Sequence, residues 1–196
     1  MGESLVSVEA ALRQSVQLDV RFHDLRGDMV TTKERAFREL FRVLESTALR
    51  YALIGGVAVQ LWRSEPRTTL DIDVAVLTYA ELPREALAQA GFRFLARHTH
   101  SENWLGPDDI PVQFTDDPGL ALFVERATVL EIAGGTVRVA RAVDLVRAKL
   151  RAGADPGRRR SKRLQDLADA EGLLEDHPGL VSDLDDEERE QLGRVR

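Results

Sequence analysis

The chain lacks cysteine altogether, and only 6% of its 196 residues are aromatic. The absence of cysteine excludes a disulfide framework, a thiolate nucleophile and a cysteine-ligated zinc site. No apolar stretch of the sequence approaches the roughly twenty residues that a helix needs to span a bilayer. The first residues also lack the basic and apolar segments of a secretion signal. We therefore expect a cytoplasmic protein that has no membrane partner.

Positive charge is scarce as well, because 27 Lys and Arg residues face 33 Asp and Glu residues, for a net charge of −6. A net acidic chain is a poor default binder of nucleic acid, since phosphate contacts require clustered cations. The charge is unevenly spread, however, with a basic run over 158–163 and an acidic run over 184–188. The basic run fits contact with RNA or a triphosphate as well as it fits a solvated helix start.

Hydrophobic residues make up 43% of the chain, which is enough for the core of one ordinary domain. Their periodicity predicts an α+β fold, in which helices pack on a mixed sheet and a helical part follows. We expect a core over residues 1–140 and a helical region over 141–196. The predicted strands are Tyr51–Ile54, Asp71–Leu77, Phe92–His98, Glu102–Leu105, Ile110–Thr115, Thr128–Ile132 and Thr136–Val139. The predicted helices are one that begins at the capping box Thr31-x-x-Glu34, and Val57–Trp62, Glu81–Ala90, Leu120–Glu125, Val143–Arg151, Lys162–Leu174 and Asp185–Leu192.

Two acidic residues stand two positions apart in the second predicted strand. Side chains alternate along a strand, so Asp71 and Asp73 share one face and repel each other. Mg²⁺ relieves such a repulsion and prefers carboxylates together with substrate phosphates. Upstream, Gly55-Gly56 permits a tight turn into a helix whose first N–H groups favour an anion. A metal-binding acid pair close to a phosphate cradle suggests nucleoside-triphosphate chemistry.

At these residues the chain resembles the nucleotidyltransferase superfamily, whose fold is that of DNA polymerase beta. The pattern Gly55-Gly56 followed by Arg67-x-Thr69-x-Asp71-Ile72-Asp73 is most similar to the AbiEii/AbiGii-type toxin branch. The resemblance is strongest over residues 34–77 and continues more weakly through 126–174. It implies a nucleotidyltransferase-like mixed sheet, a Mg²⁺ or Mn²⁺ cofactor held by Asp71 and Asp73, and backbone contacts of Gly55 and Gly56 to the phosphates.

The resemblance also suggests roles for three residues outside the acid pair. Arg67 is expected to neutralise a phosphate, although a surface ion pair explains it too. Thr69 is expected to cap or bond the turn before the acids. Lys149 matches a lysine that relatives place toward the nucleotide, whereas an isolated lysine on an amphipathic helix is more often solvated. Farther on, Lys162, Asp166 and Asp169 resemble the Lys-Asp-x-x-Asp helix of the family, and the alternative is a salt bridge on the helix surface.

This chain differs from the family at the position of the third acid of the metal site. The matching strand holds Gln113 where the family has aspartate, and an amide supplies no charge for a second metal or for a hydroxyl proton. Asp116 falls on the opposite strand face in a regular strand. A bulge or an early end of the strand would bring Asp116 or Asp117 into use as the third catalytic acid.

The expected function is transfer of a nucleotidyl group from a metal-bound nucleoside triphosphate to a hydroxyl of an RNA, a protein or a small molecule. The resemblance to the toxin branch implies a toxin that a partner antitoxin protein neutralises. Two alternatives stay open. A catalytically degenerate domain that binds a nucleotide or a partner would explain Gln113, and an antibiotic-type nucleotidyltransferase would use a small-molecule acceptor.

Overall fold

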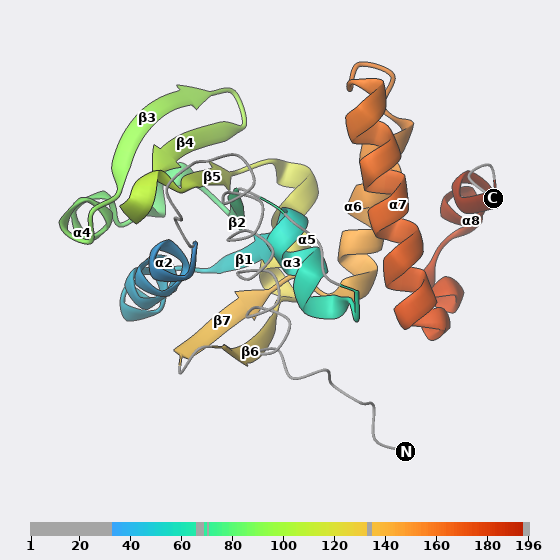
Figure 1. Ribbon diagram of the computed structural model, residues 1–196, viewed down its shortest axis with the longest axis horizontal. Helices are drawn as coiled ribbons and strands as arrows, with labels where there is room; N and C mark the ends of the chain where they lie inside the picture. Colours follow the sequence, from blue (N-terminus) through green and yellow to red (C-terminus); the bar gives the residue numbers. More distant parts are fainter. Residues whose placement is uncertain (1–32, 66–68, 70, 133–134, 194–196) are drawn as a thin grey trace, which may run out of the picture.

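A mixed seven-stranded sheet forms the centre of the protein (Figure 1). The computed structural model describes residues 33–65, 69, 71–132 and 135–193. In this part the strand order is β3-β4-β5-β2-β1-β7-β6. The pairs β2–β5 and β1–β7 are parallel, and the other neighbours are antiparallel. The strands are β1 (Tyr51–Ile54), β2 (Ile72–Val76), β3 (Arg93–His98), β4 (Ser101–Leu105), β5 (Pro111–Thr115), β6 (Thr128–Ile132) and β7 (Gly135–Val139).

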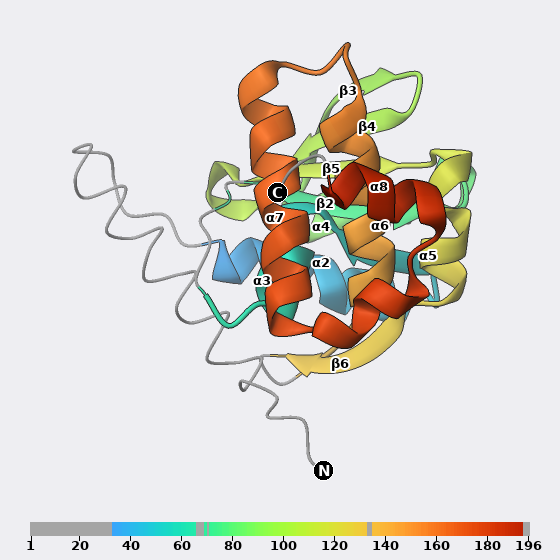
Figure 2. The ribbon, with the colours of Figure 1, turned by 90° about the vertical axis from the view of Figure 1, so that its right-hand side faces the viewer.

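Helices cover both faces of this sheet, and the α+β prediction is confirmed. Helix α2 packs against β7, whereas α3 and α5 each pack against β1 and β2. In the view of Figure 2, α3 and α5 lie on opposite sides of the sheet. The α-helices are α2 (Glu34–Ser46), α3 (Gly55–Trp62), α4 (Arg84–Gln89), α5 (Ala121–Glu125), α6 (Ala142–Ala154), α7 (Arg160–Asp176) and α8 (Asp186–Gly193). Short 3-10 segments are η1 (Tyr79–Glu81), η2 (Pro107–Asp109), η3 (Pro118–Leu120) and η4 (Pro178–Asp183). From α6 onward the described chain is helical, and the division into domains at residue 140 stays a prediction.

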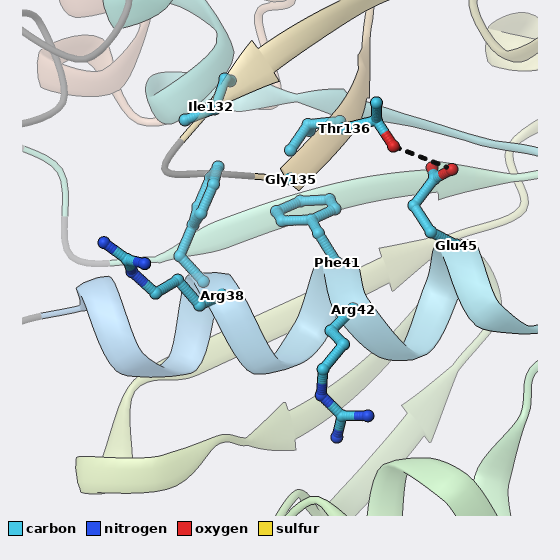
Figure 3. Close-up of a pocket in the computed structure, with 9 residues that line it drawn as sticks. Arg38, Phe41, Arg42, Glu45, Ile132, Gly135 and Thr136 are labelled. Carbon is cyan, nitrogen blue, oxygen red and sulfur yellow. Dashed lines mark hydrogen bonds between the residues drawn. The ribbon is translucent and has the colours of Figure 1, made fainter.

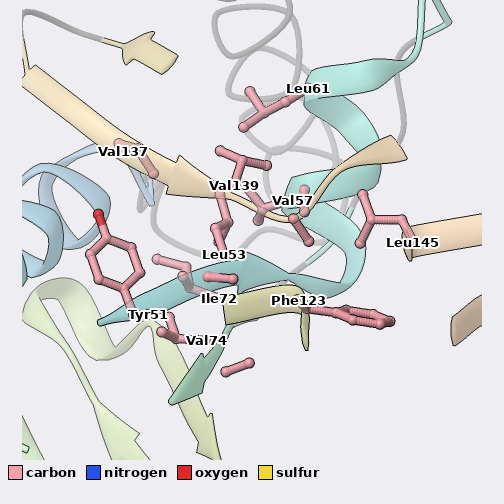
Figure 4. Packing of buried hydrophobic residues seen from close by; sticks show 14 of the residues in the cluster. Tyr51, Leu53, Val57, Leu61, Ile72, Val74, Phe123, Val137, Val139 and Leu145 are labelled. Atoms are coloured by element: carbon pink, nitrogen blue, oxygen red, sulfur yellow. The ribbon is translucent and has the colours of Figure 1, made fainter. Parts of the chain in front are cut away.

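The central strands are buried on both faces, which makes them a rigid base. On one face the ring of Tyr51 lies 5.5 Å from that of Phe41 in α2. Leu53 and Val74 are fully buried, as is Val139 on the neighbouring strand β7 (Figure 4). Each such side chain contributes about 1.5–3 kcal/mol through burial. Strands β1 and β2 are therefore held firmly where they carry polar residues at their ends.

Several predicted boundaries are confirmed, and the helix predicted over Glu81–Ala90 is wrong in its first three residues. The chain there forms η1 and then α4, which begins at Arg84, because Pro83 has no N–H to donate and disfavours helix at the residue before it. Gly91 ends α4 with a φ of +89°, as a C-terminal glycine does. Helix α2 begins at Glu34, and Thr31 of the predicted capping box lies outside the described residues.

Among the described residues, no helix is both long enough and apolar enough to cross a membrane.

Candidate active site

Asp73 is the second residue of β2, on the face that carries polar side chains, and Asp71 directly precedes the strand. Their neighbour Ile72 and the following Val74 are fully buried on the opposite face. Asp71 is exposed and Asp73 is half-buried, as strand alternation requires. In the antiparallel pair β1–β2, Asp73 is the partner of Ile54, the last residue of β1. The acid pair is thus placed beside the point where β1 gives way to α3.

Gly55 makes this close approach feasible. Its φ is +66°, in the left-handed region that favours glycine. A Cβ atom on Gly55 would collide with the carboxylate of Asp73 and lie 2.8 Å from its Cβ. Helix α3 starts at this glycine, and Ile54 before it provides no side-chain cap. The first N–H groups of α3, which have no partner within the helix, therefore start against the acid pair.

Two consecutive hydrogen bonds, from Lys33 to Thr69 and from Thr69 to Asp71, hold Asp71 in place. The hydroxyl of Thr69 donates to Asp71 Oδ1 at 2.8 Å. The ammonium of Lys33 donates to the carbonyl oxygen of Thr69 at 2.7 Å. Thr69 and Lys33 are both buried, and Lys33 is only 2% exposed. A cation that is 36 residues away in sequence thus anchors the segment that carries Asp71.

Sequence reasoning missed Lys33, since the start of an amphipathic helix gives no signal of such a contact. Thr69, in contrast, was expected to bond the turn, and it does so through Asp71. Arg67 lies outside the described residues.

Amides occupy the strand positions next to Asp73. In the parallel pair β2–β5 the register partner of Asp73 is Gln113, and the partner of Gln113 in β4 is Asn103. Register partners share a face, and neighbouring strands lie ~4.8 Å apart. The three polar side chains therefore form one row across three strands, with a carboxylate at one end and two neutral amides after it.

Asp116 is not brought into this row. It follows the last residue of β5, three positions beyond Gln113, which corresponds to ~10 Å along a strand. Its Oδ1 lies 3.5 Å from Nδ1 of His100 at the β3–β4 turn. Burial raises the pKa of the nearby Tyr79 to about 12, and the charge of Asp116 adds to that rise. Asp117 is also engaged elsewhere, because it caps η3 by accepting from the N–H of Gly119 at 2.8 Å.

Lys149 forms ion pairs between α6 and α7. Its Nζ lies 2.8 Å from a carboxylate oxygen of Asp166 and 2.8 Å from one of Asp169. Both aspartate side chains are only 4% exposed, and Arg158 adds a 2.7 Å contact to Asp166. The structure therefore brings Lys149, Asp166 and Asp169 together, as ion pairs that hold α6 against α7. Lys162 is exposed on α7.

On the opposite face of β4, a buried carboxylate fixes the β3–β4 hairpin. Glu102 has no exposed surface, and Arg84 contacts both of its oxygens, at 2.7 and 2.9 Å. Arg97 and Trp104 also donate to Glu102. Burial opposes ionisation of Glu102, but the hydrogen bonds from Arg84 and Arg97 outweigh it, so the pKa of this carboxyl lies below its usual range.

The donor set fits one Mg²⁺ better than two. Magnesium is typically bound by one or two carboxylates, with waters and substrate phosphates completing the octahedron. Asp71 and Asp73 provide two carboxylates, and the close packing of Gly55 brings the start of α3 to the same place. Within the described residues, no group of three or more His, Cys, Asp or Glu side chains is placed to hold a metal ion. A first metal would accordingly depend on the phosphates of a nucleotide for its remaining ligands.

Two cavities lie away from the acid pair. One of about 360 Å³ lies between α2 and the β6–β7 hairpin and is lined by Phe37, Phe41 and Ile132, among others (Figure 3). It is on the face of α2, opposite the face of Asp73. The other, of about 720 Å³, lies at the C-terminal end of α3 and is lined by residues such as Trp62, Arg141 and His177. Helix α3 is eight residues long, so ~12 Å of helix separates this cavity from Gly55.

Comparisons with known proteins identify the fold. No known protein family and no curated protein matches the sequence. Solved structures do match. An antigenic nucleotidyltransferase-like protein from Paracoccidioides brasiliensis is 21% identical over 71% of this chain and 74% of its own, with a TM-score of 0.51.

Two antibiotic-modifying or resistance proteins are similar as well. The lincosamide antibiotic adenylyltransferase LnuA, in its lincomycin-bound form, is 12% identical over 71% of this chain and 95% of its own, with a TM-score of 0.51. The antibiotic-resistance factor ANT(2'')-Ia is 16% identical over 75% and 90% of the two chains, with a TM-score of 0.50. The chain therefore has the fold of nucleotidyltransferase-like proteins.

Proposed function

We propose that this protein binds a nucleoside triphosphate with Mg²⁺ or Mn²⁺ and transfers its nucleotidyl group to a hydroxyl. The observation that supports this most strongly is the contact of Gly55 with the Asp73 carboxylate. It puts the start of a helix, which favours phosphate, against the Asp73 carboxylate, which together with Asp71 two residues earlier favours a cation. The nucleotidyltransferase-like fold supports the same function.

In the proposed reaction each residue has a defined task. Backbone N–H groups at Gly55 and Gly56 hold the terminal phosphates, and Asp71 and Asp73 hold the cation. The metal, once bound, neutralises charge on the phosphates and polarises them. The acceptor oxygen bonds to the α-phosphorus, the bond to the bridging oxygen breaks, and pyrophosphate leaves. The hydroxyl proton would pass to Asp73, since the register neighbour Gln113 is an amide and cannot accept it as a carboxylate would.

A second candidate function is binding of a nucleotide or a partner without turnover. The row of Gln113 and Asn103 next to Asp73 favours it, because neither amide supplies charge for a second metal. Asp116 would complete the site only if the end of β5 rearranged, given its place beside His100.

The toxin and the antibiotic-type enzyme differ in the molecule that accepts the nucleotidyl group. A toxin with an antitoxin partner would act on an RNA or a protein. An antibiotic-type enzyme would place a small molecule near the phosphates, and the structural similarity to LnuA is compatible with that form. The cytoplasmic location and the antitoxin partner stay predictions from the sequence.

Titration calorimetry with ATP, with and without Mg²⁺, tests the proposal. We expect Mg²⁺ to strengthen ATP binding to the wild type, and Asp73→Asn to abolish that effect. Asp109→Asn is a matched control, because within the described residues Asp109 forms only an exposed ion pair with Arg93, and asparagine tolerates its φ. Equal ATP affinity with and without metal in the wild type would count against the proposal.

Incubation with α-labelled triphosphates and bulk RNA then distinguishes transfer from binding alone. A labelled product that depends on Asp73 supports the enzyme. Metal-dependent ATP binding with no product from RNA, protein or small-molecule acceptors supports the degenerate binder.

A further inference from the structure

The connection between α6 and α7 carries an unusual concentration of positive charge. Five of the six residues over 158–163 are Arg or Lys, in a chain whose net charge is −6. We call these five residues the basic tip: Arg158, Arg159, Arg160, Lys162 and Arg163. In both ribbon views the connection between α6 and α7 projects beyond the sheet (Figures 1 and 2).

Only part of this charge is balanced within the described part of the chain. Arg158 pairs with Asp166, and Arg163 donates to the carbonyl oxygen of Gly153 at 2.9 Å. Arg159 and Arg160 are exposed, and neither has an acidic partner among the described residues. Lys162 has only a 3.5 Å contact with the side chain of Gln165. Three cations of the basic tip therefore face solvent side by side.

The position of these cations is unfavourable for the isolated protein. Arg159 is the N-cap of α7, and Arg160 is its first residue. The N-terminal end of a helix carries partial positive charge, so acidic residues are stabilising there and cations are destabilising. The first turn of α7 contains no acidic residue. Folding therefore gathers like charges at a site that repels them, and an anionic partner would remove the repulsion.

We propose that the basic tip binds the phosphate backbone of an RNA. This binding does not depend on the proposed nucleotidyl transfer. Four of the five cations are arginines, which bond phosphates in a bidentate way and stack on bases. Leu164, which is 55% exposed, lies four positions after Arg160 and so adds apolar surface on the same side of α7.

The geometry favours an extended polyanion over the other anionic ligands. Arg159, Arg160 and Lys162 are exposed, and the basic tip lines neither of the two cavities described above, so a small anion at these side chains would meet an open surface. A membrane surface requires a broad apolar face in addition to cations, and Leu164 is the one large, exposed apolar side chain on the described part of α7. A nucleic-acid backbone needs only a row of exposed cations.

Fluorescence anisotropy with a labelled single-stranded RNA of about twenty nucleotides tests the proposal on the full chain. The buffer contains EDTA and no nucleotide, so the result does not depend on the proposed catalytic site. The test variant is Arg159→Glu with Arg160→Glu. The control is Arg50→Glu with Arg126→Glu, which makes the same change in net charge at two exposed arginines outside the basic tip.

We expect the test variant to lose RNA affinity at least about tenfold at low salt, and the control to lose much less. The slope of log K against log salt should fall by about 1.4, because each phosphate contact to a single strand contributes ~0.7. The test variant also puts glutamates at the start of α7, so its midpoint in urea should be no lower than that of the wild type. A loss of binding would then not come from unfolding.

Three results would overturn the proposal. One is an equal change of affinity in the test and control variants. Another is displacement of the RNA by equimolar inorganic triphosphate, which would indicate a site for a small anion. The third is binding to phosphatidylserine vesicles that depends on the basic tip, without binding to RNA. Tip-dependent RNA binding in a protein that transfers no nucleotide would support the RNA site and contradict only the proposed reaction.

Discussion

Substitution of Gly55 by alanine tests the structural basis of the candidate site. Two costs follow from the structure. A residue with a Cβ at a φ of +66° loses about 1–2 kcal/mol relative to glycine. The new Cβ would also lie 2.7 Å from Cγ of Asp73 and overlap its carboxylate, and forcing an extra methyl into a packed site costs about 1–3 kcal/mol. We expect Gly55→Ala to lower the free energy of unfolding by about 2–5 kcal/mol, as measured by urea denaturation.

Gly91→Ala is the matched control, because it has the backbone cost without the collision. Gly91 has a φ of +89°, and the nearest atom to its added Cβ is Cγ of Pro107, at 3.7 Å. The difference between the two variants isolates the contact with Asp73. We expect only Gly55→Ala to lose the metal-dependent part of ATP affinity, measured by calorimetry well below the melting temperature. Equal destabilisation by the two substitutions, or full metal-dependent ATP binding in Gly55→Ala, would refute the reasoning.

Three further predictions concern Lys33, Glu102 and Gln113. Lys33→Met leaves the carbonyl of Thr69 without its buried donor, so we expect a loss of about 1–3 kcal/mol in unfolding free energy together with weaker Mg²⁺-dependent ATP binding; unchanged ATP binding would show that Lys33 does not position the acid pair. The pKa of Glu102 is lower in the folded than in the unfolded chain, so its stabilisation is present above about pH 4.5 and is lost as the pH falls. Glu102→Gln should therefore cost on the order of 3 kcal/mol at pH 7 and flatten the decline of stability between about pH 5 and pH 3 in urea titrations; an unchanged slope would contradict the role of this carboxyl. Gln113→Asp restores a carboxylate beside Asp73, so a gain of nucleotidyl transfer over the wild type would identify the natural chain as degenerate, and no gain with an active wild type would show that the third acid lies elsewhere.

Local patterns predicted much of the fold. The strand over Tyr51–Ile54 is confirmed at both ends, and Gly91 ends its helix as predicted. These features depend on alternation along a strand and on the backbone freedom of glycine, which a few neighbouring residues decide. The break at Pro83 was missed because the apolar spacing continued across it, although the proline itself carries the signal.

Predictions about contacts between residues far apart in the sequence were less complete. The sequence matched Lys149 to a nucleotide-binding lysine of the family, whereas the structure places its ammonium between Asp166 and Asp169. A choice among several oppositely charged partners depends on how α6 and α7 pack. Spacing along one helix carries no information on that.

The sequence by itself determined that Ile72 and Val74 are buried while Asp71 and Asp73 are more exposed, and that a glycine turn precedes them, because both properties follow from the geometry of adjacent residues. Only the tertiary structure decided that Gly55 packs against Asp73, that Lys33 anchors Thr69, and that Gln113 is the register neighbour of Asp73. These contacts depend on which strands pair and in what register. Pairing is set by burial of the whole sheet rather than by any single segment, so it emerges only when the chain is folded.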